Sequence, residues 1–215
     1  MRALIVYAHP EPTSFTAALK ERAVAVLTSE GWEVEVSDLH AENFNPVAGR
    51  HDFAGEPADG TRFHYQTEQA KAAAEDGFAP DLAREQARVA RADLLVFLFP
   101  LWWGGPPAIV KGWLERVLAY GFAYVDGARF ESGFFRNKRG LIGVVTGGTP
   151  QRFSETGVYG PIEKVLWPMQ RLALEYMGLK VFTPFVAYAA PRVDAQQREI
   201  YLDAFAQRVR EAASG

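Results

Sequence analysis

The chain has 215 residues, a formal net charge of -3, 48% hydrophobic residues and no cysteine. This length is typical of one domain with a substantial core, so we predict a single domain over residues 1–215. The charge argues against nucleic-acid binding, and the lack of cysteine excludes a disulfide framework or a Cys-ligated metal. The histidines have no ligand spacing and no apolar run is long enough to cross a bilayer, so we expect no metal site and a cytoplasmic protein.

Short apolar runs alternate along the chain with segments of helical periodicity. Strands are predicted at 2–8, 32–36, 94–99, 139–146 and 180–186, and helices at about 15–30, 67–75, 81–91, 108–119, 161–177 and 194–213. Thr13 or Ser14 is the expected N-cap of the first helix, and Asp81 and Asp194 are expected to cap two later ones. Alternating strands and helices predict a parallel sheet with helices on both faces, in the strand order 2-1-3-4-5.

The segment 93–107, DLLVFLFPLWWGGPP, is the centre of this arrangement. A buried strand ends at Pro100 and runs into Trp102 and Trp103, followed by glycines and prolines that let a ligand approach the backbone. Open α/β sheets bind ligands at the carboxyl ends of their strands. Both tryptophans are therefore expected to face a ligand, and the alternative is that both belong to the core.

Three loops, which follow the first, third and fourth strands, are expected to meet at this edge of the sheet. The first lacks the glycine patterns of dinucleotide-binding turns and P-loops, but it offers Thr13, Ser14 and Thr16 where a helix begins. Two interpretations of these hydroxyls remain, phosphate binding and simple helix capping. His9 is likewise either a phosphate ligand or a structural residue. Because the second loop adds flat rings and the turn at 147–148 adds backbone donors, the three together indicate a flavin site.

The sequence resembles the flavodoxin-like NAD(P)H:quinone oxidoreductases, the DT-diaphorase group. The resemblance lies in the strings RALIVYAHPEPTSFTAALKE, GWEVEVSDLHAENFNP, FPLWWGGPPAIVKGWLERV, GFAY, VTGG and LWPMQ, in that order over nearly the whole chain. It implies a flavodoxin-like fold and a homodimer with a flavin at each subunit contact, FAD being favoured and FMN possible. It also implies a ping-pong, two-electron reduction of quinones, in which NAD(P)H passes a hydride through the bound FAD.

The resemblance assigns roles to individual residues. Those expected around the pyrophosphate and ribose are His9, Thr13, Ser14, Phe15, Thr16 and Ala18. Those expected along the isoalloxazine ring and its polar edge are Pro100, Leu101, Trp102, Trp103, Gly104, Thr146, Gly147, Gly148 and Thr149. Arg198 matches a position near the adenine, which favours FAD over FMN.

The implied catalytic groups are Tyr159 and the amides of Gly147 and Gly148. The implied substrate pocket contains Trp103, Tyr124, Asp126, Phe153 and Tyr159, with Tyr124 reaching the pocket of the partner subunit.

Several positions depart from the family pattern and leave the choice of substrate open. Phe153 and Tyr159 stand where the family commonly has a Tyr and a His, so a Tyr-His relay cannot operate. Tyr159 is still expected to donate a proton or a hydrogen bond. Asp126 replaces a second tyrosine of the pocket, and His64 replaces a glutamine near the ribityl end of the flavin.

Three other functions are compatible with the same residues. The first is a cytoplasmic ancillary or regulatory subunit of a potassium-efflux system. The second is a one-electron carrier similar to flavodoxin, and the third is a nitro or azo reductase.

Overall fold

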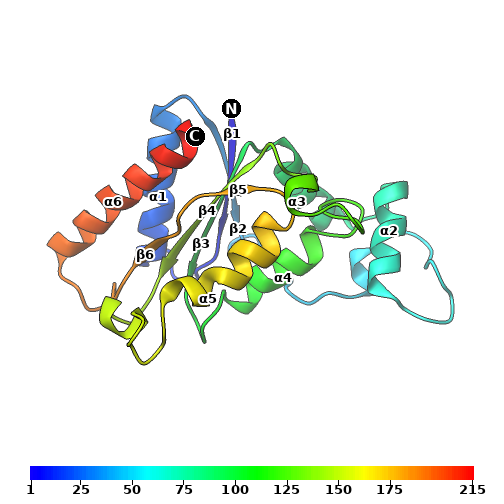
Figure 1. The fold of residues 1–215 in the computed structure, drawn as a ribbon. Coiled ribbons are helices and arrows are strands. Elements are labelled where there is room, and N and C mark those ends of the chain that lie inside the picture. Colours follow the sequence, from blue (N-terminus) through cyan, green and yellow to red (C-terminus); the bar gives the residue numbers. More distant parts are fainter.

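The computed structural model describes residues 1–215 and contains one parallel sheet between two layers of helices (Figure 1). Its strands are β1 (Arg2–Tyr7), β2 (Glu33–Asp38), β3 (Leu94–Pro100), β4 (Arg139–Val145), β5 (Lys180–Val181) and β6 (Phe185–Ala187). The order β2-β1-β3-β4-β5 confirms the predicted topology, and β6 is an additional strand that pairs with β4.

The predicted fifth strand, 180–186, is divided into β5 and β6. Pro184 lies in the gap between them and has no N–H to donate to a neighbouring strand. Both short strands pair only with β4 and together form one edge of the sheet. The interruption keeps the direction of the strand but breaks its hydrogen-bond ladder.

Helices cover both faces of the sheet (Figure 1). They are α1 (Phe15–Ser29), α2 (Tyr65–Glu75), α3 (Pro80–Arg91), α4 (Ala108–Val117), α5 (Ile162–Met169) and α6 (Ala195–Ser214). Shorter turns are η1 (Arg50–Asp52), η2 (Phe130–Ser132), η3 (Pro150–Phe153) and the π-helical η4 (Gln170–Glu175). α1 and α6 lie on one face, α3, α4 and α5 on the other, and α2 lies farther out beyond α4. None of the helices is long and apolar enough to cross a membrane.

The helix ends refine the predicted caps. The Ser14 hydroxyl accepts from the Ala17 N–H at 3.1 Å, so Ser14 rather than Thr13 caps α1. Asp194 caps α6 as predicted. The prediction that Asp81 caps α3 is wrong, because the helix begins one residue earlier at Pro80, a residue type suited to the first helical position.

The predicted helix 161–177 is continuous in space but changes type. It runs as α5 up to Met169 and continues as the π-helical η4. Pro168 lies near the junction, and a proline inside a helix removes one backbone hydrogen bond and crowds the preceding turn.

The core has two parts, one on each face of the sheet. Along β3, Leu95 and Phe97 pack toward one set of helices, and Val96 and Leu98 pack toward the other. Every residue of β3 is buried. Such a strand has no polar face because parallel sheets in α/β proteins are covered on both sides.

The long segment between β2 and α3 is held down by a buried charge cluster. The Arg116 guanidinium donates to Asp52 Oδ1 at 2.6 and 2.9 Å, and Tyr65 donates its hydroxyl to Asp52 Oδ2 at 2.5 Å. Arg116 and Asp52 are 1% and 0% exposed. We call these three residues the anchor. It joins η1 and α2 to α4, which explains how so long a connection has a fixed structure.

Candidate functional site

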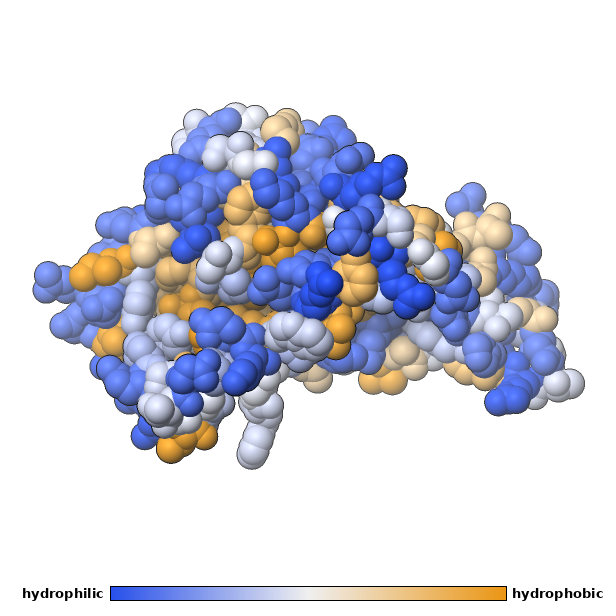
Figure 2. Space-filling view, in the orientation of Figure 1, coloured by the Kyte–Doolittle hydropathy of each residue, from blue (hydrophilic) through white to orange (hydrophobic).

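Two adjoining cavities open at the carboxyl ends of β1, β3 and β4. The first has a volume of about 570 Å³ and the second about 650 Å³. Leu101, Thr146 and Gly147 line both of them, so the two share a boundary. The surface between α6 and α5, over the edge of the sheet, exposes hydrophobic residues surrounded by hydrophilic ones (Figure 2).

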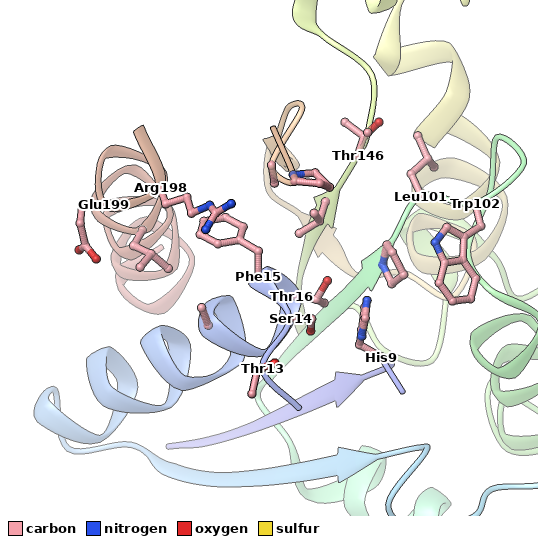
Figure 3. A pocket seen from close by; sticks show the side chains of 17 residues that line it. His9, Thr13, Ser14, Phe15, Thr16, Leu101, Trp102, Thr146, Arg198 and Glu199 are labelled. Carbon is pink, nitrogen blue, oxygen red and sulfur yellow. The ribbon is translucent and has the colours of Figure 1, made fainter. Parts of the chain in front are cut away.

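The first cavity brings together most of the predicted flavin-binding residues (Figure 3). The predicted residues among its lining are His9, Thr13, Ser14, Phe15, Thr16, Ala18, Pro100, Leu101, Trp102, Thr146, Gly147 and Arg198. Sequence reasoning did not single out Val145, Ala190, Pro191, Glu199 and Leu202, which complete it. These lie at the end of β4, after β6 and on α6, where no polar motif marks them.

The start of α1 offers unsatisfied donors to this cavity. The N–H groups of Phe15 and Thr16 make no hydrogen bond within the protein, as expected for the first turn of a helix. The Thr16 hydroxyl is also without a partner although the residue is only 1% exposed. Buried polar groups are normally paired, so these three groups together form a place for an anionic or polar ligand atom.

His9 is prepared to act as a hydrogen-bond donor. Its Nδ1 accepts from the Glu11 N–H at 3.0 Å, so a neutral ring has its hydrogen on Nε2. Burial lowers the pKa of His9, which favours this neutral form near pH 7. Thr13 differs, because its N–H and hydroxyl both donate to Glu11 Oε1, at 2.9 and 2.7 Å.

The two tryptophans after β3 lie on a tight turn and neither belongs to the core. Trp102 and Gly105 exchange two backbone hydrogen bonds of 3.0 Å. Between them Trp103 and Gly104 have φ of 50° and 73°, the signature of a type I′ turn. Trp103 is 106% exposed and Trp102 47%. A bulky residue in this left-handed conformation is strained by roughly 1–2 kcal/mol, and such strain is concentrated at functional sites.

The two glycines after β4 have different roles. A Cβ on Gly148 would lie 2.5 Å from the Phe153 ring, so Gly148 makes room for that ring. Its N–H donates to the Thr146 hydroxyl at 3.0 Å. Gly147 is exposed, its N–H makes no hydrogen bond within the protein, and it lines both cavities. Gly147 is therefore the glycine whose amide is available to a ligand, whereas Thr149 lies outside both cavity linings.

The second cavity contains three of the five predicted substrate-pocket residues. Trp103, Phe153 and Tyr159 line it, with the Phe153 and Tyr159 rings 5.1 Å apart between centroids. Arg152 donates to the Tyr159 hydroxyl oxygen at 3.4 Å, which leaves the phenol hydrogen available for another acceptor. Arg152 and Arg192 also line this cavity, and sequence reasoning missed both because neither belongs to a recognisable motif. The one usable signal was that Arg152 closely follows the Gly-Gly turn.

The remaining two predicted pocket residues lie elsewhere in the chain. Tyr124 lines a third cavity of about 710 Å³ with His64 and Gln66, and its ring packs against Tyr120. Asp126 is exposed and lines neither of the first two cavities. A single chain therefore does not bring these two residues to the second cavity. The structure contains no group of three His, Asp or Glu residues arranged to hold a metal ion.

Comparison with known proteins fits this geometry. A family described by its flavodoxin-like fold matches residues 1–212. NAD(P)H dehydrogenase (quinone) 1 of Rattus norvegicus is 44% identical over 208 residues, which are 97% of this chain and 76% of that protein. The chain belongs to the flavodoxin-like NAD(P)H:quinone oxidoreductase family.

Other members of this family match over similar lengths. Ribosyldihydronicotinamide dehydrogenase (quinone) of Mus musculus is 40% identical over 97% of this chain and 90% of that protein. The crystal structure of a candidate quinone reductase from Klebsiella pneumoniae superposes with a TM-score of 0.93 at 36% identity, over 98% of this chain and 84% of that one. The family and the fold expected from the sequence are thus both confirmed.

Proposed function

We propose that this family member is an NAD(P)H dehydrogenase (quinone) that binds FAD in the first cavity and reduces quinones in the second. The observation that carries the proposal is the shared boundary of the two cavities at Gly147. Anion-binding groups lie on one side of this boundary and an aromatic pocket on the other. A redox cofactor that extends from one to the other would present its reactive ring to a substrate.

The groups around the first cavity fit FAD. The free amides of Phe15 and Thr16, the unpaired Thr16 hydroxyl and His9 Nε2 are suited to phosphate oxygens. Arg198 extends from α6 toward Phe15 and has no ion-pair partner, so its guanidinium is available at the far end of the cavity (Figure 3). FMN has no group that would reach this arginine, which is why we favour FAD.

When bound, the flavin supplies two-electron transfer from NAD(P)H to the quinone. The chain contributes orientation, charge stabilisation and protons. The Gly147 N–H is available to stabilise negative charge at the polar edge of the ring. Tyr159 is available to donate its phenol proton to the reduced quinone, and solvent restores that proton. Trp103 projects at the rim of the second cavity, where it can stack on a planar substrate and exclude water.

We also propose that the protein acts as a homodimer in the cytoplasm. Tyr124 lines a cavity separate from the other substrate-pocket residues, so a role for it in the reaction requires a second copy. Large apolar side chains on and after α5 are exposed in the single chain, including Trp167 at 52% and Leu172 at 55%. Covering such groups favours association. Sedimentation velocity should give about twice the chain mass, and a monomer at micromolar concentration would contradict this part of the proposal.

One preparation tests the central proposal. The purified protein should be yellow, release FAD that mass spectrometry distinguishes from FMN, and oxidise NAD(P)H when menadione is added. A colourless protein that binds neither flavin in a titration would rule the proposal out.

Tyr159→Phe should keep its flavin but reduce quinone more slowly in stopped-flow experiments, and unchanged rates would remove Tyr159 from the mechanism.

A further inference from the structure

The second cavity has an excess of positive charge that the proposed quinone reaction does not use. Arg152 and Arg192 line it, and no aspartate or glutamate does. Neither guanidinium is within ion-pair distance of a carboxylate in this chain, whereas Arg22, Arg88, Arg91 and Arg116 all are. The cavity therefore has two unpaired cations among aromatic and apolar groups.

Both guanidinium groups lie beside the groups assigned to the reaction. Arg192 Nη2 is 4.0 Å from the position that a Cβ on Gly147 would occupy. Arg152 Nη1 is 3.4 Å from the hydroxyl oxygen of Tyr159. A substrate that contacts the Gly147 amide and Tyr159 would thus lie within reach of both arginines.

Three carboxylates close in sequence to Arg152, Arg192 or the first cavity have partners other than these two arginines. Glu155 is 3.8 Å from Lys164, and the Asp194 carboxylate accepts the Gln197 N–H at 2.8 Å as the cap of α6. Glu199, on the first cavity, is 3.5 Å from Arg22. The arginines of the second cavity therefore have no carboxylate partner within this chain and remain available to an anion from outside it.

We propose that the second cavity selects substrates that carry an acid group beside a planar ring, and that Arg152 and Arg192 bind this group. A guanidinium binds phosphate, sulfonate or carboxylate through paired N–H donors, with more geometric specificity than a lysine gives. This inference rests on the proposed function, because it concerns the substrate of that site. Two molecules of the reaction offer such a group: NAD(P)H through its phosphates, and an acceptor with an acid substituent on its ring.

A binding experiment tests the charge preference without turnover. Flavin-loaded protein is titrated with naphthalene-2-sulfonate and with neutral 2-naphthol, following tryptophan fluorescence or heat. Wild type should bind the sulfonate more tightly. Arg152→Gln and Arg192→Gln should each weaken sulfonate binding by about five- to tenfold and leave naphthol binding unchanged, because one charge-assisted hydrogen-bonding group is lost.

Arg210→Gln is the matched control. It removes the same charge from an exposed arginine on α6 that is 3.4 Å from Glu30 and lines neither cavity. This variant should bind the sulfonate as wild type does, and Arg192→Lys should keep part of the preference. Equal affinity of wild type for the two ligands, or an equal loss in Arg210→Gln, would overturn the inference.

Steady-state kinetics then identify the source of the acid group. If it belongs to the acceptor, the two glutamine variants raise KM for a sulfonated naphthoquinone by a larger factor than KM for menadione. If it is a phosphate, they raise KM for NADH or NADPH but not for ribosyldihydronicotinamide, which has none. If the ratio of the two KM values is the same in the variants as in wild type for both substrate pairs, the inference is contradicted. The proposed quinone reductase activity is not contradicted by that result. A wild type that binds the sulfonate but reduces no quinone contradicts the proposed function instead.

Discussion

The chain uses arginine in two contrasting ways. In the anchor, Arg116 is 1% exposed, and its guanidinium donates to Asp52, Asp81 and the Asn45 carbonyl. In the second cavity, Arg152 and Arg192 are exposed and have no carboxylate partner. The anchor engages all three guanidinium nitrogens of Arg116, whereas Arg152 makes one long contact with the Tyr159 hydroxyl and the Arg192 guanidinium makes no hydrogen bond within the chain.

This difference shows how the fold separates stability from binding. A buried guanidinium that loses its partners is left with a large desolvation penalty, so anchor residues are needed for folding. An exposed guanidinium is solvated without partners, so its removal affects what the cavity binds and has little effect on the folded state. Variants of the anchor should therefore lose stability, and variants of the cavity should lose binding.

Removing the cation of the anchor should give the largest loss of stability. Arg116→Leu leaves Asp52 charged, buried and without its main partner, which should lower the free energy of unfolding by about 3–5 kcal/mol. Arg192→Gln should change it by less than about 0.5 kcal/mol. Urea unfolding of the two variants measures both values. Similar losses in both would show that the two classes of arginine do not differ.

The tyrosine of the anchor should make stability depend on alkaline pH. Burial, together with its hydrogen bond to Asp52, raises the pKa of Tyr65. Below about pH 10, where an unfolded tyrosine keeps its proton, the contribution of Tyr65 is fully present, and it is lost as the pH rises through the folded-state pKa. Tyr65→Phe should lower stability by about 1–3 kcal/mol at pH 7 and flatten its decline above pH 10. Identical alkaline slopes in chemical unfolding would contradict this.

The two hydroxyls at the start of α1 also differ in role: that of Ser14 stabilises the helix, and that of Thr16 is available to a ligand. Thr16→Val removes a buried hydroxyl without a partner, so the flavin-free protein should be as stable as wild type or more so. FAD affinity should fall about tenfold if this hydroxyl binds the cofactor. Ser14→Ala removes the cap and should lower the free energy of unfolding by about 1 kcal/mol. Titration with FAD and urea unfolding separate the two effects, and unchanged FAD affinity in Thr16→Val would exclude that hydroxyl from the site.

Trp103 should show the smallest effect on stability, and in the opposite direction. Trp113 is fully buried and donates to Glu85 at 2.8 Å, whereas Trp103 is solvent-exposed with φ of 50°. Asparagine accepts this conformation readily, so Trp103→Asn should raise the free energy of unfolding by up to about 1 kcal/mol. It should also raise KM for planar substrates. A loss of several kcal/mol, as expected for a core tryptophan, would show that the ring packs against the protein.

Sequence reasoning was most successful where neighbouring residues decide the structure. The apolar run of β3 predicted a strand buried on both faces, and the Thr-Ser pair before α1 predicted a cap, which the structure assigns to Ser14. The convergence of the three loops followed from the topology of parallel strands. These features depend on local periodicity and on rules that hold for any sheet of this kind.

Groups that meet across long stretches of sequence were not predicted. Asp52 and Arg116 are 64 residues apart, and nothing near either of them in the sequence indicates the pair. Arg192 comes to Gly147 only because the chain returns past β4 through β6. Asp81 was expected to cap a helix, but its carboxylate lies 3.3 Å from Arg116.

The sequence by itself determined the layer order and the strand order, because these depend on hydrophobic periodicity and strand direction. The residue types of three loops, and not periodicity, led us to expect a flavin at the carboxyl edge of the sheet. Only the tertiary structure decided which donors are free: the Gly147 amide but not that of Gly148, the Thr16 hydroxyl but not that of Thr13, and Arg192 but not Arg116. The physical reason is that a hydrogen-bonding group is available to a ligand only when no other part of the folded chain has reached it.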